Sequence, residues 1–467
     1  MIDLLIRNAL IVTVNKQRQI LKNCALAIEG DLIFDIGPTS ILEKKYAKAK
    51  KTIDATGKII FPGLINTHNH LFQTLLKGLG DDLALHDWIA QMISPSVSCI
   101  ISKDIYNASL LGCIEGIHSG TTTMLDYMYA HPHPYLSDAV IRAFRELKMR
   151  GIFARGMQDS GEKFGISPKI IEDVKTIEKD CRRLFKEYHG KDNDRIHIWL
   201  APGVVWSSSQ ESLKMVWALT QEYKTGFTIH ISETPFDRQA SKEVHGITDV
   251  EVLEKLGIVG PNVLMVHCVY LTPRDIRMLK YYDVKVSHNA VSNMYLASGI
   301  APIPQMIERG ITVGLGTDGA ASNNTQDMIE TLKITSLLHK VHTLDPTIIT
   351  AEKVFEMATI DGAKALGLED KIGSLEVEKK ADLFIYNPAL SPKSTPMHNP
   401  ISTLVYSGSN ECVETVIIDG NIILENKKLI SINEKEVISN AQRTADDLAS
   451  RAGTNKNKDC KWRSLSF

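Results

Sequence analysis

Eight short apolar segments that alternate with longer amphipathic ones constrain the fold more than any other feature of the sequence. Each gap between them can hold a helix, for example 104–119 and 171–188. Alternating strands and helices predict a parallel sheet, and eight such units predict an α/β fold, the (β/α)8 TIM barrel. A doubly wound open sheet is the alternative, but no glycine-rich phosphate fingerprint follows the early strands. The apolar segments lie at 63–68, 121–126, 151–156, 196–202, 227–231, 263–267, 284–287 and 312–317.

Both ends of the chain have a different pattern, which is typical of antiparallel strands and tight turns. Turn signals at Asn15, at Gly30-Asp31 and at Asp419-Gly420 separate short apolar runs. We therefore expect a small composite β-sandwich domain from both chain ends, a catalytic barrel, and a C-terminal helix with a basic tail. The expected strands are 4–14, 25–36, 381–386, 413–418 and 421–424; the expected domains are 1–60 with 374–430, 61–373, and 431–467.

Composition excludes several classes of protein. The chain has 467 residues, of which 43% are hydrophobic and 23% charged, so it can bury a large core. Its 53 basic and 55 acidic residues almost cancel, which gives no indication of a nucleic-acid partner. No stretch approaches the length of a transmembrane helix, and Arg7 and Asn8 interrupt the apolar N-terminus, which argues against a signal peptide. We expect no membrane partner.

The cysteines indicate a reduced, cytoplasmic protein. They are odd in number and scattered, and no two are spaced as CxxC, so neither a disulfide framework nor a thiolate zinc knuckle is expected. The seven are Cys24, Cys99, Cys113, Cys181, Cys268, Cys412 and Cys460.

Four motifs place histidines and carboxylates at the carboxyl ends of expected strands. They are His68-Asn69-His70, HISE at 230–233, VHC with His267, and GTDG with Asp318. Each motif alone is weak evidence, because a lone histidine is usually packed and a lone aspartate usually caps a helix. Together they meet where barrel active sites lie. Since residues two apart in a strand share a side, His68 and His70 can bind one ion. Histidine and carboxylate suit zinc or ferrous iron.

These motifs carry a resemblance that runs through nearly the whole chain, to MATIDGAKALGL and KADLFIYN. The chain resembles the amidohydrolase superfamily, in the aminohydrolase branch that deaminates heterocycles. Relatives in this branch include s-triazine hydrolases, 8-oxoguanine deaminase and isocytosine deaminase. The segments that carry the likeness are PGLINTHNHLFQTLLKG, HISE, MVHCVY, SNMYLASGIAPIP and VGLGTDGAASNN.

The resemblance implies a ligand set and catalytic roles. One divalent metal per chain, zinc before ferrous iron, would be held by His68, His70, His230 and Asp318. The metal lowers the pKa of water to near 7. Asp318 would then accept a proton, His267 would hold the water, and Glu233 would protonate the ring nitrogen beside the attacked carbon. A loop salt bridge is the alternative for Glu233. The resemblance also implies a homo-oligomer, a dimer or tetramer.

Five further residues are candidates for contact with the substrate. Gln73 could reach it with its amide or cap the following helix, and Trp88 could stack on a flat ring or pack the lid. Ser322 could bond a ring substituent or cap the helix that starts near Asn323. The candidates are Gln73, Trp88, Trp206, His288 and Ser322.

Two departures from the branch favour one class of substrate. Adenosine-type deaminases usually have a His-Pro-Tyr motif after the fourth strand, where this chain has APGVVWSSS, with Val205 and Trp206. Chloride-displacing relatives have Asn after the metal-binding Asp, where this chain has Gly319. We therefore expect a hydrolytic deaminase of a small planar amino-heterocycle, namely isocytosine or cytosine, a guanine-type purine base, or an aminotriazine.

Three other functions stay open. The first is an s-triazine chlorohydrolase-like or cyclic amide hydrolase. The second is a deaminase of S-adenosylhomocysteine or methylthioadenosine. The third is a catalytically inactive barrel scaffold, which predicts missing ligands, whereas all the expected ligands are present in this sequence.

Overall fold

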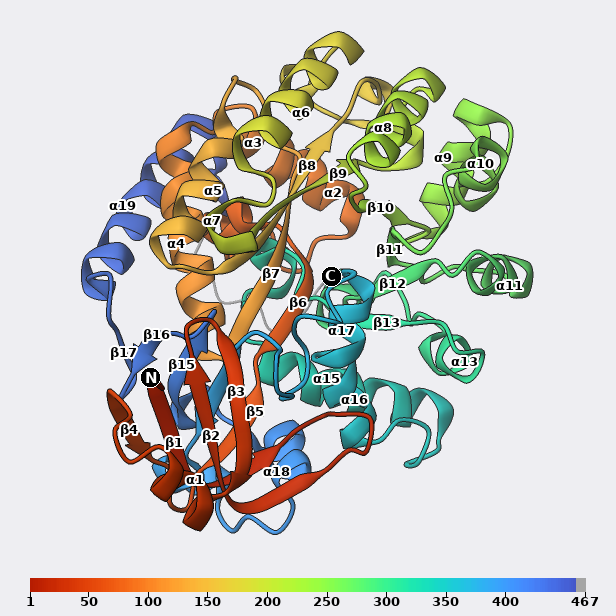
Figure 1. The fold of residues 1–467 in the computed structure, drawn as a ribbon. Helices are drawn as coiled ribbons and strands as arrows, with labels where there is room; N and C mark the ends of the chain where they lie inside the picture. Colours follow the sequence, from red (N-terminus) through yellow and green to blue (C-terminus); the bar gives the residue numbers. More distant parts are fainter. Residues whose placement is uncertain (459–467) are drawn as a thin grey trace.

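The computed structural model describes residues 1–458, and within that range eight parallel strands form a nearly closed barrel (Figure 1). The eight-unit prediction is confirmed, and three of the strands have the bounds expected from the sequence. In barrel order the strands are β6 (Leu64–Asn69), β7 (Thr121–Met128), β8 (Arg150–Met157), β9 (Ile196–Pro202), β10 (Phe227–Ile231), β11 (Val263–His267), β12 (Lys285–His288) and β13 (Val313–Leu315).

Amphipathic helices surround the barrel. In α6 (Val174–Tyr188), the apolar residues recur at one-turn spacing, so Ile177, Cys181 and Phe185 are buried on one face. The helix begins where the Asp173 side chain accepts a hydrogen bond from Thr176 N at 3.0 Å. The other helices around the barrel are α4 (Ser102–His118), α5 (Leu136–Glu146), α7 (Lys191–Asp194), α8 (Gln210–Glu222), α9 (Pro235–His245), α10 (Asp249–Leu256), α11 (Pro273–Tyr281), α12 (Ala290–Tyr295), α13 (Ile303–Glu308), α14 (Ala320–Asn323), α15 (Met328–Thr343), α16 (Ala351–Met357) and α17 (Ile360–Ala365).

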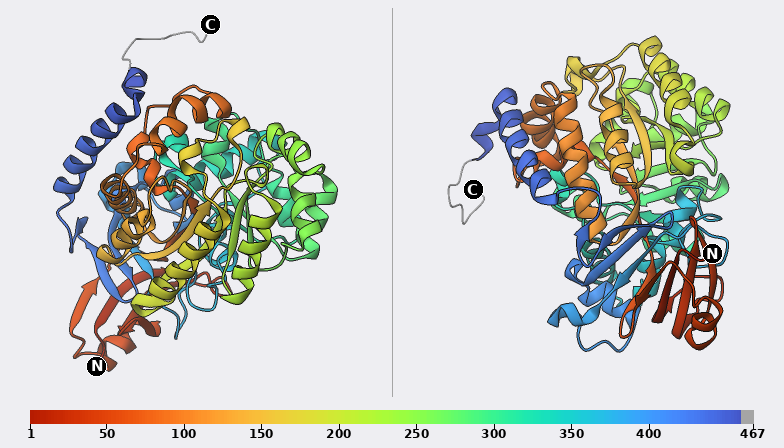
Figure 2. Two further views of the ribbon diagram at one scale, coloured as in Figure 1. Left: turned by 90° about the horizontal axis from the view of Figure 1, so that it is seen from above. Right: turned by 60° about the vertical axis from the view of Figure 1, so that its left-hand side comes forward.

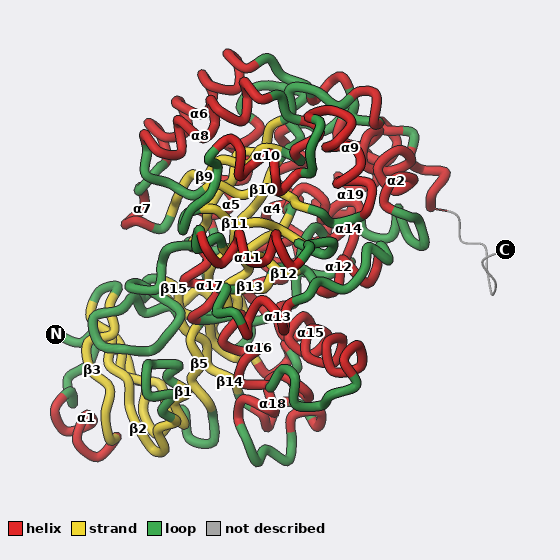
Figure 3. The backbone as a smooth tube through the Cα atoms, turned by 90° about the vertical axis from the view of Figure 1, so that its right-hand side faces the viewer, coloured by secondary structure: helices red, strands yellow, loops and turns green. Residues whose placement is uncertain are grey.

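The two chain ends share one mixed sheet, which lies beside the barrel in Figure 3. The small β domain expected from the sequence takes the form of this continuous sheet, in which β5 (Ile59–Pro62) pairs with both β1 (Leu4–Val12) and β14 (Leu383–Tyr386). Its other strands are β2 (Ile20–Glu29), β3 (Leu32–Pro38), β4 (Lys51–Asp54), β15 (Val413–Ile418), β16 (Asn421–Glu425) and β17 (Lys428–Leu429). Helix α1 (Thr39–Lys45) packs on the sheet, and α18 (Pro400–Ser407) packs against α15 and α16.

A short helical segment forms a lid over one side of the barrel mouth. It consists of α2 (Leu85–Trp88), a π-helical turn (Ile89–Ile93) and α3 (Ser94–Val97). The C-terminal helix α19 (Glu434–Ala452) runs alongside α4 and α3, as both views of Figure 2 show. Asn457 Nδ2 donates to Leu79 O at 3.1 Å, just before the lid. The C-terminal helix thus packs against α3 of the lid, and the 3-10 turn after it (Thr454–Lys458) contacts the lid through Asn457.

The barrel closes between its first and last strands through a seam of polar contacts. Asp318 N donates to His68 O at 3.0 Å, and Thr67 Oγ1 donates to Leu315 O at 2.9 Å. Gly314 has to be glycine here, because a Cβ would lie 2.6 Å from Thr67 Cγ2. Two of the expected metal ligands are thus joined directly by the closure.

Three further observations concern the described residues. No single helix among residues 1–458 is long and apolar enough to cross a membrane; the pair 85–97 and 102–118 passes that test only jointly, across a 119° bend. The six cysteines within this range are free. Cys460 and the end of the expected tail lie outside the described residues.

A buried ion pair connects the barrel to the mixed sheet. Arg150, at the start of β8, donates to both Asp382 carboxylate oxygens, at 2.7 and 3.0 Å. Its Nη2 also lies 3.3 Å from Asp419 Oδ1, after β15. All three side chains are almost fully buried.

Because removing one partner leaves a buried charge, we expect Asp382→Asn to destabilise the protein by about 3–5 kcal/mol. The matched control is Glu243→Gln, which breaks the Lys163–Glu243 pair, whose side chains are more than half exposed. That change should cost less than about 1 kcal/mol. Thermal unfolding of both variants measures the difference, and equal shifts in the midpoint would contradict a structural role for Asp382.

Candidate active site

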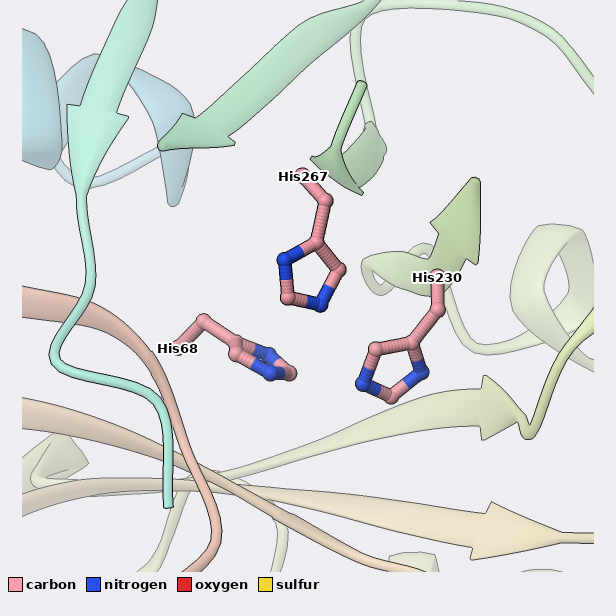
Figure 4. Close-up of side chains that lie close together, drawn as sticks. All are labelled: His68, His230 and His267. Carbon is pink, nitrogen blue, oxygen red and sulfur yellow. The ribbon is translucent and has the colours of Figure 1, made fainter. Parts of the chain in front are cut away.

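The histidines and carboxylates singled out from the sequence converge at the carboxyl end of the barrel. His68 lies in β6, His230 in β10 and His267 at the end of β11, and Figure 4 shows their rings directed toward a common point. His70 follows β6 and Asp318 follows β13. Two overlapping triads each have their potential ligand atoms within 4.8 Å of one another: His68, His230 and His267, and His68, His70 and Asp318.

The spacing of four of these groups fits one metal ion. His70 Nε2 lies 3.3 Å from His230 Nε2, and Asp318 Oδ1 lies 3.4 Å from Nε2 of both His68 and His70. Ligand atoms about 2.0–2.1 Å from a shared tetrahedral centre are about 3.3–3.4 Å apart. Neither ring nitrogen of His68 has a hydrogen-bond partner among the described residues, although the ring is fully buried. A divalent cation would give the Nε2 atom of this ring a partner.

Backbone carbonyls orient two of the rings. His70 Nδ1 contacts Tyr127 O, and His230 Nδ1 lies 2.8 Å from Gly203 O. Donation from Nδ1 leaves Nε2 free for a metal. Burial lowers the pKa of His68 to about 4 and those of His70 and His230 to about 3. The three rings are therefore neutral at pH 7, the form in which histidine binds metals.

His267 and Glu233 form a second pair beside the ligands. His267 Nε2 lies 3.6 Å from Glu233 Oε2 and 3.9 Å from Asp318 Oδ2. Burial opposes the charged imidazole, but the Glu233 and Asp318 carboxylates outweigh it and raise the pKa of His267. Burial also raises the pKa of the Glu233 carboxyl. The pair can thus hold a proton beside the metal-binding groups.

Backbone strain marks two of these positions. His267 has φ 69° and Asp318 has φ 63°, in the left-handed region that residues other than glycine rarely adopt. Such strain is typical of functional sites and costs about 1–3 kcal/mol per residue. His267 ends β11 and Asp318 lies three residues after β13, so the left-handed backbone occurs where the chain leaves these strands at the site.

One pocket is lined by the other members of this cluster, with His68 behind them, and by four of the five predicted substrate contacts. The pocket has an open volume of about 850 Å³, including its mouth. The lid, the loop after β8 and the segment after β9 close its sides. Its polar and aromatic lining comprises His70, Gln73, Trp88, Ser94, Tyr129, Gln158, Trp206, His230, Glu233, Asp237, His267, Asp318 and Ser322, and apolar side chains with Gly203 line the rest.

Each of the two predicted tryptophans has its indole N–H engaged. Trp88 Nε1 donates to Ala321 O at 3.0 Å, and Trp206 Nε1 donates to Asp237 Oδ1 at 2.9 Å. Their polar edges are thereby fixed, and their apolar surfaces border the pocket. Both of the roles considered for Trp88, packing the lid and lining the site, are compatible with this position.

Gln73 lies against the backbone that follows the metal-binding aspartate. Its Nε2 donates to Tyr129 OH at 3.1 Å, whereas its Oε1 is buried without a hydrogen-bond partner among the described residues. A Cβ on residue 319 would lie 1.8 Å from Gln73 Oε1. The present position of Gln73 therefore depends on glycine at residue 319, whose φ of −70° is ordinary for any residue.

His288 is the predicted contact that the structure leaves outside the pocket. Ser287 faces Thr67, with 2.7 Å between the hydroxyl oxygens. Neighbouring residues of a strand point to opposite faces, and β12 continues through His288. The ring of His288 is therefore directed to α15, where its Nε2 lies 3.0 Å from His339 Nε2.

Two residues that sequence reasoning did not assign orient the catalytic pair. Asn293 Oδ1 lies 2.9 Å from His267 Nδ1, and Ser298 Oγ donates to Glu233 Oε1 at 2.9 Å. Both belong to the SNMYLASG segment that carried the family resemblance. The resemblance indicates that this segment is important, but only the fold shows that its side chains contact His267 and Glu233.

Comparison with known proteins agrees with this geometry. The amidohydrolase family profile matches residues 59–423. A 5'-deoxyadenosine deaminase of Methanobrevibacter smithii is 40% identical over 448 residues, which are 95% of this chain and 98% of the relative. A 5-methylthioadenosine/S-adenosylhomocysteine deaminase of Thermoanaerobacter pseudethanolicus is 37% identical over 449 residues, covering 96% and 100% of the two chains.

Solved structures show the same fold. An adenosine deaminase of Xanthomonas campestris with bound zinc is 27% identical, with a TM-score of 0.88 over 96% of this chain and 99% of that one. An atrazine chlorohydrolase of Arthrobacter aurescens, complexed with zinc and atraton, is 24% identical, with a TM-score of 0.89 over 95% and 100% of the chains. The chain therefore belongs to the amidohydrolase family, as a metal-dependent deaminase that hydrolyses carbon–nitrogen bonds.

Proposed function

We propose that the protein hydrolytically deaminates the adenine ring of a 5'-deoxy-type nucleoside. The observation that carries this proposal is 40% identity over 95% of the chain with a 5'-deoxyadenosine deaminase, in a chain that retains the whole set of metal-binding and proton-transfer groups. This substrate differs from the free bases and aminotriazines that the sequence motifs favour.

A free base or an aminotriazine is the second candidate. It is favoured by Val205 and Trp206, which stand where adenosine-type deaminases usually have a His-Pro-Tyr motif. Both residues are almost fully buried, and Trp206 is fixed by Asp237, so neither offers the substrate the imidazole or hydroxyl of that motif. The two candidates share the reacting amino carbon and differ in what is attached to the ring.

The chemistry requires a polarised water, and the four ligands supply a place for one cation. A divalent metal held by His68, His70, His230 and Asp318, zinc before ferrous iron, would bring a water to hydroxide at neutral pH. Burial favours the neutral form of the three imidazoles, and backbone carbonyls orient the rings of His70 and His230, so the site is largely preorganised for this role.

Glu233 is positioned to move a proton to the ring. Burial raises the pKa of the Glu233 carboxyl, which shifts it toward the protonated form that can donate a proton. The Ser298 hydroxyl fixes one oxygen, and the other oxygen faces His267. We assign Glu233 the protonation of the ring nitrogen next to the amino-bearing carbon, which makes that carbon electrophilic.

His267 and Asp318 complete the proton transfers. His267 would orient the attacking water, with its ring held by Asn293. Asp318 has a second oxygen 3.9 Å from His267 Nε2, so it can accept the proton of the water and deliver it to the departing amine. Gln73, Trp88, Trp206 and Ser322 are proposed to contact the heterocycle. A homo-oligomeric state and a cytoplasmic location stay predictions from the sequence.

Ammonia release from a panel of compounds tests the proposal. Protein loaded with about one zinc ion per chain should release ammonia from 5'-deoxyadenosine, with less or none from cytosine, isocytosine, guanine and an aminotriazine. Removing the metal with a chelator should abolish release, and adding zinc should restore it. A metal-loaded protein that deaminates only a free base or triazine would establish the second candidate, and release from none of them would contradict both.

The role of Glu233 gives a separate prediction. Glu233→Gln keeps the shape of the side chain but removes the proton donor, so kcat should fall by about 10²–10⁴-fold with metal content unchanged. Glu243→Gln on the nearby exposed surface is the matched control and should keep wild-type kcat. A Glu233→Gln variant with near-normal kcat would place the proton transfer elsewhere.

The contact between Gly319 and Gln73 gives another testable prediction. Gly319→Ala should displace the Gln73 amide and raise KM roughly 10-fold, the worth of one hydrogen bond, while metal content is retained. If the effect runs through Gln73, adding Gly319→Ala to Gln73→Ala should cost little more than Gln73→Ala alone. Independent, multiplying losses in the double variant would show that the two residues do not act together.

A further inference from the structure

The part of the pocket away from the metal-binding groups has an apolar wall. Six side chains make up what we call the apolar wall: Leu85, Ile89, Ile93 and Val97 from the lid, and Ile166 and Ile170 from the loop after β8. Val204, Trp206 and Leu296 extend it. From this wall we infer that the substrate carries an uncharged, apolar substituent on its amino-heterocycle, and that substrates with an anionic or zwitterionic tail are rejected. The inference rests on the proposed function and narrows it.

The pocket extends beyond the metal-binding groups, because the lid and the loop after β8 also contribute to its lining. Ser94 and Gln158 also line the pocket, and both are uncharged. The groups that would hold a reacting ring lie around the metal ligands. A free base would occupy that end and leave the apolar wall uncovered, so the wall favours a substrate with a second, apolar part.

The described lining residues offer no cation to an anionic tail. No lysine or arginine is among them; the carboxylates are Glu233, Asp237 and Asp318. Asp237 is already engaged by Trp206 Nε1 at 2.9 Å and by Thr234 N at 2.8 Å. A phosphate or carboxylate would therefore meet a negative, already hydrogen-bonded site.

The nearest lysines of the same loop have other partners. Lys163 pairs with Glu243 at 2.7 Å, and Lys169 Nζ lies 3.5 Å from Ser98 O. Both belong to the segment that contributes Ile166 and Ile170 to the wall. Because that segment directs its apolar side chains to the pocket and its lysines to other groups, the charge preference is a property of the fold around the pocket.

The free energy of burial differs between an apolar and a charged substituent. Each methylene buried against the wall strengthens binding by about 4-fold, the equivalent of about 0.8 kcal/mol. A charged group buried there without a partner loses its hydration, and its penalty is far larger than the gain from its methylenes. We therefore expect discrimination by charge rather than by length.

A series of adenine nucleosides that differ only at the 5' position tests the inference. Zinc-loaded protein should deaminate 5'-deoxyadenosine and 5'-methylthioadenosine with kcat/KM values within about 10-fold of each other. S-adenosylhomocysteine, which has a zwitterionic tail, and adenosine 5'-monophosphate should be at least about 100-fold poorer. A value for either charged compound within 10-fold of the methylthio compound would overturn the inference and leave deamination itself established.

A binding measurement covers the case in which no nucleoside is deaminated, which would contradict the proposed function. Calorimetry would then compare two aminotriazines, one with an N-alkyl chain and one with an N-carboxyalkyl chain of equal length. Tighter binding of the alkyl compound, by at least about 100-fold, supports the apolar wall independently of turnover. Equal affinities would overturn it.

A matched pair of variants tests the wall itself. Ile166 is only partly buried, so Ile166→Lys can place a cation at the pocket edge, and Ile166→Met is the neutral control. The ratio of kcat/KM for the monophosphate to that for the methylthio compound should rise at least about 10-fold in Ile166→Lys and stay within about 3-fold in Ile166→Met. Leu85→Lys with Leu85→Met repeats the test from the lid if Ile166→Lys does not fold. An unchanged ratio in both lysine variants would contradict the inference.

Discussion

The closure of the barrel between β6 and β13 is the constraint on which the site depends. The hydrogen bond from Asp318 N to His68 O joins two of the metal ligands at that seam. Glycine directly after the last strand allows it, because a Cβ at Gly316 would lie 2.8 Å from His68 O. The contacts that close the barrel therefore also set the distance between these two ligands. A change that weakens the closure would move Asp318 away from His68.

The groups of the site reduce the stability of the fold. Several imidazoles and carboxylates are buried together, and the ring nitrogens of His68 have no hydrogen-bond partner among the described residues. Left-handed backbone at His267 and Asp318 adds strain. The large apolar core around the site offsets this cost, and a bound cation would recover part of it by giving His68 Nε2 a partner.

Much of this arrangement could be predicted from residues alone. The strands 196–202, 227–231 and 263–267 have the bounds expected from their apolar runs, because a parallel strand buried on both faces is an unbroken apolar segment. The ligands could be predicted because barrel chemistry lies where strands end. The two chain ends were recognised as β structure, but a sequence does not show that β5 joins β1 to β14 in one sheet, since pairing partners come from far apart in the chain.

The sequence by itself determined the family, the barrel and which residue types meet at its mouth, since these follow from local patterns and motif spacing. Only the tertiary structure decided where side chains point. It directed His288 toward His339, because His288 still belongs to β12 and its side chain points to the face opposite that of Ser287. It also brought Gln73 against Gly319, and the lid against the loop after β8. Such contacts join segments distant in sequence, and their geometry depends on how the whole chain packs.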